Sequence, residues 1–280
     1  KEGPTISLEK GTWEQLMDLY TLSDANIFIN EETKNWVCNF LPLNNNYFIL
    51  DGDLPKKDWC TQERSPLLSS GDGEFHTVVP GRPLGLHPQD VQQLAEQKIH
   101  LHFYGDFTHG QWREWIDKTM KMADGYLHIH PNVDQGEWVK EFSQYDAGWL
   151  HFFKSDNYKE VTRIDWNDLN IPARMSTLAF AGLPMLQYDN EEHTVAIQSL
   201  AKRLAISLFF TNMSQLKMLL QDEPRMKQIR ENVWNQRHLF TFDHHADELI
   251  AFFHKVIQNK SAQLQENISV PAIAALKPDL

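Results

Sequence analysis

The sequence predicts an α/β protein built on a doubly wound parallel sheet, because short apolar segments alternate with amphipathic helical segments from about residue 75 onward. Six segments have the length and composition of strands: 75–80, 99–104, 126–130, 147–153, 184–188 and 206–210. Apolar residues recur every three or four positions, as helices require, over 88–97, 111–123, 135–145, 171–181, 191–204, 213–222 and 243–258. This alternation predicts helices on both faces of a single sheet.

The first fifty residues predict a smaller, partial α/β piece. Two short apolar segments, 25–29 and 47–50, accompany two helical segments, and two strands are too few to close a core. Residues 53–74 are rich in Asp, Pro, Ser and Gly, which predicts a linker. We therefore divide the chain into a terminal part of a neighbouring domain (1–52), the linker (53–74), the main domain (75–259) and a C-terminal arm (260–280) without clear periodicity.

The composition limits the classes of partner. A formal net charge of −12 over 280 residues excludes extensive nucleic-acid binding, which needs many cations along the phosphate backbone. Cys38 and Cys60 are the two cysteines, too few for a disulfide framework, so we expect a cytoplasmic protein. No apolar segment approaches the roughly 20 residues of a transmembrane helix, which leaves at most peripheral membrane contact. The chain begins with Lys rather than Met, so we expect further sequence upstream.

A cation near the start of one predicted helix points to an anionic ligand. Asn170 is suited to cap a helix that begins at Ile171, and Pro172 fits its first turn. Arg174 then opposes the positive end of the helix dipole unless an anion lies beside it. Gly182 ends the helix. Arginines on their own usually face water or pair with acids, so the position becomes informative only beside a second signal.

The second signal is Gly81–Arg82, which follows the predicted strand 75–80. The carboxyl ends of the strands form the edge where open α/β sheets bind ligands. Two arginines at that edge can hold a diphosphate and stabilise the charge on a departing nucleotide.

Three segments in order resemble the C-terminal, donor-binding domain of GT-B glycosyltransferases: VVPGRPLG at 78–85, YDAGWLHFF at 145–153 and LNIPARMSTLAFAGLPML at 169–186. In addition, SDANIFINEET resembles the last strand and helix of the family's N-terminal domain, and LDGDLPK its interdomain turn. The similarity covers roughly residues 24–258. It implies that residues 75–259 form a Rossmann-like nucleotide-sugar-binding domain and that residues 1–52 end the acceptor-side domain.

The resemblance also implies a set of site residues. These are Gly81, Arg82 and Arg174 for the donor diphosphate, His130, Val133, Ser176 and Thr177 for the base and ribose, and His151 and Glu192 for the donor sugar. Several have ordinary structural alternatives: the histidines as packing residues, the two hydroxyl residues as small helix-packing residues, and Glu192 as a helix cap.

The sequence departs from the family where retaining members often carry Glu-x7-Glu. Leu169 and Thr177 occupy those positions, so neither carboxylate is present. Retaining or inverting stereochemistry and the identity of the donor both stay open. The base of an inverting enzyme would come from the N-terminal domain, most of which is not in this chain, so we expect the chain alone to be inactive.

Two histidine pairs, His100/His102 and His128/His130, each share one face of a predicted strand. Four imidazoles would cluster if these strands were neighbours, but we favour ordinary packing over a zinc site because no cysteine or carboxylate has ligand spacing beside them. We expect no metal and no cofactor. The Gly-x-x-x-x-Gly-Lys and Gly-x-Gly-x-x-Gly motifs are absent, which disfavours nucleotide hydrolysis and NAD chemistry.

The sequence therefore predicts a glycosyltransferase that takes a nucleotide-diphosphate sugar as substrate, this chain supplying the donor-binding half. The acceptor is a carbohydrate, a lipid-linked molecule or a protein. Two alternatives stay open: a non-catalytic binding module derived from the same fold, and a sugar-nucleotide epimerase.

Overall fold

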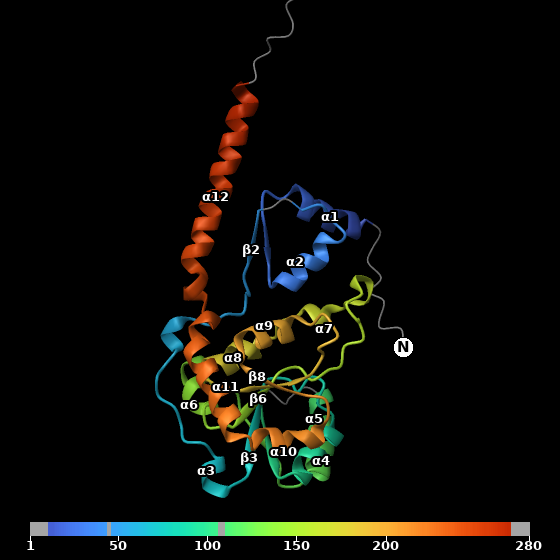
Figure 1. The fold of residues 1–280 in the computed structure, drawn as a ribbon, viewed down its shortest axis with the longest axis vertical. Coiled ribbons are helices and arrows are strands. Elements are labelled where there is room, and N and C mark those ends of the chain that lie inside the picture. Colours follow the sequence, from blue (N-terminus) through green and yellow to red (C-terminus); the bar gives the residue numbers. More distant parts are fainter. Residues whose placement is uncertain (1–10, 44–45, 106–109, 270–280) are drawn as a thin grey trace, which may run out of the picture.

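The main sheet has six parallel strands in the order β5-β4-β3-β6-β7-β8 (Figure 1). The structure is a computed structural model, and it describes residues 11–43, 46–105 and 110–269. The strands are β3 (Phe75–Pro80), β4 (Ile99–Tyr104), β5 (Leu127–His130), β6 (Ala147–Trp149), β7 (Met185–Tyr188) and β8 (Ser207–Phe210). The predicted doubly wound parallel sheet is confirmed. β6 is shorter than the predicted 147–153 because the backbone N–H of Phe152 donates instead to Leu84 O in the loop after β3.

The strand order creates a crevice at the centre of the sheet. From β3 the chain moves outward through β4 and β5, and from β6 it moves outward in the other direction through β7 and β8. The loops that leave β3 and β6 therefore diverge at the carboxyl edge, the arrangement in which open α/β sheets bind ligands.

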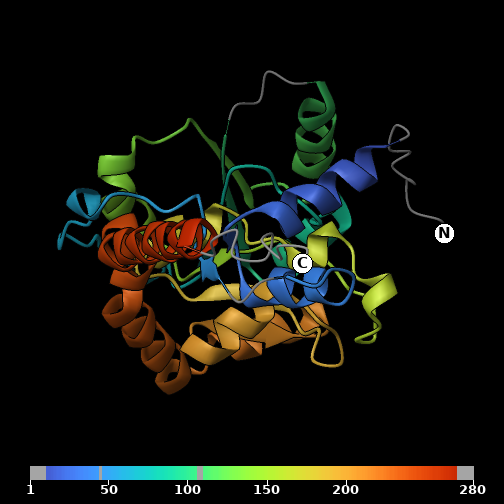
Figure 2. The ribbon, with the colours of Figure 1, turned by 90° about the horizontal axis from the view of Figure 1, so that it is seen from above.

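Helices cover both faces of the sheet. They are α4 (Pro88–Glu96), α5 (Gly110–Met122), α6 (Trp138–Phe142), α7 (Trp166–Leu169), α8 (Arg174–Phe180), α9 (Ala196–Leu204), α10 (Leu216–Leu220) and α11 (Glu223–Gln236), with 3-10 turns η2 (Gln135–Glu137), η3 (Val161–Arg163), η4 (Met213–Gln215) and η5 (Arg237–Phe240). Trp115 of α5 packs edge-on against Phe103 of β4, and Leu178 of α8 lies against Gly148 of β6 on the opposite face. Seen from above, α5 (green) and α11 (orange) lie on opposite sides of the molecule (Figure 2).

The helix expected from Ile171 begins later than predicted. Asp165 accepts hydrogen bonds from the backbone N–H groups of Asn167 and Asp168, which caps the separate short helix α7. The N–H of Asn170 closes that turn by donating to Trp166 O, so Asn170 ends α7 and does not cap α8. α8 begins at Arg174, which keeps this cation in the first turn.

The C-terminal region also differs from the prediction. α12 (Phe242–Ser269) is one continuous helix that passes through the expected boundary at residue 260, and residues 270–280 of the predicted arm lie outside the described part of the chain. α11 was not predicted, although Met226, Ile229 and Val233 form a buried face at helical spacing after the capping residue Asp222.

The N-terminal piece consists of α1 (Thr12–Leu22), β1 (Asn26–Phe28), α2 (Glu31–Cys38) and β2 (Tyr47–Ile49), and its two strands pair in parallel. Its buried apolar cluster is small: Phe28, Val37 and Leu41. Asn30 Nδ2 donates to Leu169 O at 2.7 Å and Trp36 Nε1 to Val161 O at 3.1 Å, so the piece is attached to the main domain. Figure 1 shows it above that domain and beside α12.

Residues 53–74, predicted as a linker, contain η1 (Lys57–Trp59) and α3 (Ser69–Asp72). The N–H of Leu68 donates to Gln144 O at 2.9 Å, and Ser69 Oγ donates to Asp146 Oδ1 at 2.7 Å. The second half of this segment therefore packs on the main domain. Across the described residues, no helix is both long enough and apolar enough to span a bilayer.

We expect Gly148→Ala to lower the free energy of unfolding by about 1–3 kcal/mol. A Cβ on Gly148 would lie 2.2 Å from Leu178 Cδ2, so the buried Leu178 side chain must shift or β6 and α8 must separate. Urea denaturation measures the change, and Gly71→Ala is the matched control because its Cβ meets no atom within 4 Å. Equal stability of the two variants would contradict this account of the contact.

We expect residues 1–50 expressed alone to show no cooperative thermal transition by circular dichroism. The two-stranded sheet and three-residue cluster bury too little apolar surface to offset the loss of conformational entropy. A cooperative transition of the isolated fragment would show that it is an independent domain.

Candidate functional site

A cleft of about 570 Å³ lies at the carboxyl edge of the sheet. Its walls come from the segment after β2, the ends of β3 and β4, the loop after β5, α6 and the start of α8. The lining residues are Gly52, Asp53, Leu54, Pro55, Lys56, Trp59, Pro80, Gly81, Tyr104, Asn132, Val133, Gln135, Trp138, Phe142, Ala173, Arg174 and Thr177. The cleft therefore lies between the linker and the main domain.

Arg174 is the most unusual group in the cleft wall. Its side chain is buried, with the residue 8% exposed, and Nη2 donates to the carbonyl oxygen of Arg82. Nη1 is buried and has no hydrogen-bond partner among the residues that the structure describes. Burial and the neighbouring Arg82 lower the pKa of Arg174 to about 10, which still leaves the guanidinium charged at neutral pH. The site thus holds a buried cation with an unused donor.

Gly81, which has no side chain, lies beside this cation. Its φ is +91°, a conformation that favours glycine, and a Cβ built on Gly81 would lie 4.0 Å from Arg174 Nη2. The N–H of Gly81 donates to Tyr104 O at 2.7 Å, which fixes the turn after β3. The absence of a side chain at Gly81 leaves room for a ligand next to the guanidinium.

His151 adds a third basic group near Arg82 and Arg174. Burial and the positive charges of these two arginines lower the pKa of His151 to about 4, so its imidazole is neutral at physiological pH. The three groups come from the loop after β3, the segment after β6 and the first turn of α8. Arg174 Nη2 donates to the backbone carbonyl of Arg82, so these two residues lie side by side, but Arg82 is exposed and, like His151, is not among the residues that line the cleft.

Two other predicted residues line the same cleft. Val133 is partly buried in the loop after β5, and Thr177 lies one turn after Arg174 on α8. Gly81, Val133, Arg174 and Thr177 therefore share one cavity, as a ligand that extends from a phosphate to a base requires.

The structure places the remaining candidates elsewhere. His130 Nε2 is hydrogen-bonded to His102 Nδ1 at 2.9 Å, and its ring stacks on Tyr104. Ser176 is 1% exposed and, like the exposed Glu192, is not among the residues that line the cleft. His130 thus belongs to a histidine row on the sheet.

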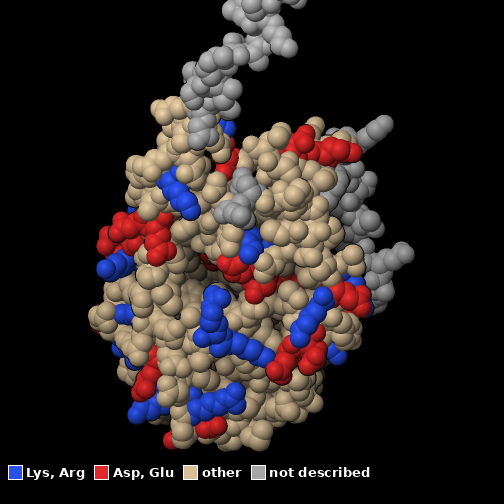
Figure 3. All heavy atoms as spheres, turned by 45° about the horizontal axis from the view of Figure 1, so that its top comes forward, with Lys and Arg blue, Asp and Glu red and all other residues tan. Residues whose placement is uncertain are grey.

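Sequence reasoning missed the contribution of the linker to the cleft. Lys56 and Trp59 line it, as does Asp53. The resemblance of LDGDLPK to an interdomain turn was a usable signal, because such a turn lies between the two halves of the fold. Figure 3 shows a hollowed face on which basic and acidic side chains both gather, so the overall negative charge does not extend evenly over the surface.

Comparison with known proteins yields similarity of structure without recognisable similarity of sequence. No protein-family model matches the chain, and no curated protein matches it significantly. Sucrose-phosphate synthase from Thermosynechococcus elongatus superimposes with a TM-score of 0.63 at 10% identity, over 92% of this chain and 65% of that chain. The accessory secretory protein 1, 2 and 3 structure from Streptococcus pneumoniae gives 0.52 at 11% identity, over 89% of this chain and 47% of that chain.

These similarities, together with the sheet order, define the class: the chain has the GT-B glycosyltransferase fold, with the six-stranded sheet as its Rossmann-like domain. The resemblance inferred from three sequence segments is confirmed at the level of the fold. The chain spans 65% of the sucrose-phosphate synthase structure, so it corresponds to part of that molecule. Identity of 10% establishes the fold alone.

We expect the pKa of His151, about 4 in the native protein, to rise in Arg174→Ala because a neighbouring positive charge is removed. Burial keeps it below the ordinary value of about 6.5. NMR titration of the imidazole measures the shift, and Arg113→Ala on the exposed side of α5 is the control.

The same depressed pKa has a consequence for folding. The unfolded chain binds the His151 proton more readily than the folded chain, so this group lowers stability as the pH falls from about 6.5 toward 4.

In the NMR test, a His151 titration that is the same in Arg174→Ala as in the native protein would show that the two side chains do not interact.

Proposed function

We propose that this chain binds a nucleotide-diphosphate sugar in the carboxyl-edge cleft and forms the donor-binding half of a glycosyltransferase. The observation that carries the proposal is the buried guanidinium of Arg174, whose Nη1 has no partner, in the wall of that cleft. Burying a charge without a counter-charge is unfavourable, and a bound anion offsets the cost.

A diphosphate matches the surroundings of Arg174 better than a single carboxylate does. Gly81 leaves space beside Nη2, and Lys56 adds a second cation from the linker to the same cleft. Two phosphoryl groups can therefore contact cations from both walls. The nucleoside would extend toward Val133 and Thr177, which line the same cavity.

The arrangement supports the leaving-group half of sugar transfer. As an acceptor hydroxyl attacks the anomeric carbon, the bond to the β-phosphate breaks, and the nucleoside diphosphate leaves with the electron pair. Arg174 stabilises the charge that develops on the departing phosphate. The acceptor proton must pass to a base, which we assign to the acceptor-side half of the molecule. The acceptor is a carbohydrate, a lipid-linked molecule or a protein.

We expect Arg174→Ala to weaken nucleotide-diphosphate affinity by about ten- to a hundredfold, because a charge-assisted contact contributes roughly 1.5–3 kcal/mol. The melting temperature should change little, since the substitution removes an uncompensated buried charge together with its bond to Arg82 O. Arg174→Lys should give an intermediate affinity, because the charge is kept and the forked geometry is lost.

Isothermal titration with UDP-, GDP- and dTDP-sugars provides the measurement, with Arg113→Ala as the matched surface control. If no sugar nucleotide binds the native chain at about 1 mM, the non-catalytic module is the correct class. Leu169 and Thr177 in place of two acids are the observation that favours that rival. Conversion of one sugar nucleotide into its epimer, without an acceptor, would identify an epimerase.

A further inference from the structure

One face of the sheet carries five histidines in two hydrogen-bonded rows: His76, His100, His102, His128 and His130. In the first row, His76 Nδ1 lies 2.9 Å from His102 Nε2, and His102 Nδ1 lies 2.9 Å from His130 Nε2. In the second, His100 Nδ1 lies 2.9 Å from His128 Nε2. From the sequence, we expected the histidines to cluster only if the two strands that carry them were neighbours. These strands, β4 and β5, do pair in the sheet.

Each row ends in a carboxylate at the amino edge of the sheet. Asp72 Oδ2 lies 2.9 Å from His76 Nε2, and Glu74 Oε2 lies 3.1 Å from His100 Nε2. The rings of His76 and His100 are stacked, with centroids 4.4 Å apart and planes within 9°. Both Nε2 atoms are therefore directed to the same end of the sheet, where the two acids lie.

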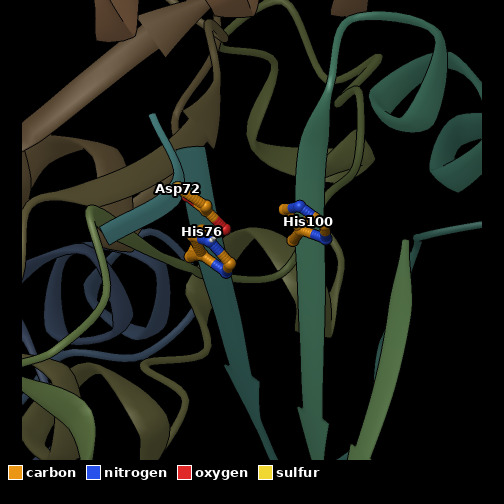
Figure 4. A group of neighbouring side chains, drawn as sticks. All are labelled: Asp72, His76 and His100. Atoms are coloured by element: carbon orange, nitrogen blue, oxygen red, sulfur yellow. Dashed lines mark hydrogen bonds and ion pairs between the residues drawn. The ribbon is translucent and has the colours of Figure 1, made fainter. Parts of the chain in front are cut away.

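One ligand atom from each of Asp72, His76 and His100 lies within 4.8 Å of the others (Figure 4). We propose that these three residues, with Glu74 beside His100, form a Zn²⁺ site at the amino edge of the sheet. Two imidazole nitrogens and one or two carboxylate oxygens are a donor set that zinc accepts in tetrahedral geometry. Zinc–ligand distances of roughly 2.0–2.2 Å require the ligand atoms to move closer together by side-chain rotation.

The histidine rows are suited to support such a site. Without a metal, the carboxylate of Asp72 accepts a hydrogen bond, which assigns the proton of neutral His76 to Nε2. His76 Nδ1 then accepts a hydrogen bond from His102 Nε2–H, so every N–H in the row is directed toward the acid. Zinc on His76 Nε2 displaces that proton, and the row reverses: each Nδ1–H donates to the next Nε2. Zinc-bound histidines commonly donate their other N–H to such a partner, which fixes the ring orientation.

The charge state of the site fits a cation. Asp72 Oδ1 accepts from the backbone N–H of Glu74, and Glu74 Oε1 accepts from Lys98 Nζ, so both carboxylates are held beside the two imidazoles. Lys98 Nζ, 3.1 Å from Glu74 Oε1, competes with a metal, but its side chain is 64% exposed and can move into water.

The site lies at the opposite edge of the sheet from the cleft. Asp72 ends α3, whereas His76 and His100 stand near the starts of β3 and β4, so the metal would join the linker to two strands. A cavity of about 480 Å³ lined by Asp72, Glu74 and Lys98 gives access from solvent. The expected role is structural, and it is independent of the proposed nucleotide site.

The test is Zn²⁺ binding to the whole chain after removal of metal by a chelator. We expect one Zn²⁺ per chain by competition with a fluorescent zinc indicator, and a higher melting temperature at about 100 µM Zn²⁺. Asp72→Asn and His100→Gln should each weaken binding by about a hundredfold or more, because each removes a direct ligand. His128→Gln, which removes only the partner of His100 Nδ1, should weaken it by a smaller factor within about 10–100-fold.

His254→Gln on the exposed surface of α12 is the matched control and should bind Zn²⁺ as the native chain does. Circular dichroism of each metal-free variant establishes that it is folded. Absence of stoichiometric binding, or binding that Asp72→Asn and His100→Gln leave unchanged, would overturn the proposal. Neither outcome affects the nucleotide site, which is measured separately with Arg174 variants.

Discussion

The contact of β6 with α8 is the constraint on which the candidate site depends. Gly148 has no side chain, which allows Leu178 to approach the strand directly. This contact sets the height of α8 over the sheet and hence the position of Arg174 in its first turn. Because β3 pairs with β6, the turn at Gly81 lies beside the same helix start. The buried guanidinium of Arg174 therefore lies at the crevice of the doubly wound sheet.

The net charge of the chain does not show how its charged side chains are distributed between the two edges of the sheet. The chain has a net charge of −12, yet Arg82, Arg174 and His151 converge at the carboxyl edge, where burial and mutual repulsion lower the pKa of the last two. At the amino edge, two carboxylates face two imidazoles. The carboxyl edge thus holds a buried cation, and the amino edge holds two carboxylates against two imidazoles, with Lys98 beside Glu74.

The same sheet links these two edges. His76, His102 and His130 form a continuous row along one face, and His130 stacks on Tyr104, which lines the cleft. Hydrogen-bonded side chains on a parallel sheet fix one another's orientation. The row therefore gives the sheet a polar, ordered face under α6, where an apolar layer would be the usual solution.

The sequence by itself determined the sheet, because apolar strands and helical periodicity are local properties. It also indicated Gly81, Arg82 and Arg174, because their positions at strand and helix ends follow from local signals. It misplaced the start of α8, since the Asp165 cap competes with Asn170, and it missed the continuation of α12. Only the tertiary structure decided that Arg174 is buried with its Nη1 unpartnered among the described residues, that Lys56 lines the same cleft, and that Asp72 and Glu74 meet the histidines. Those relations join segments distant in the chain, and strand order and packing, which no local pattern encodes, bring them together.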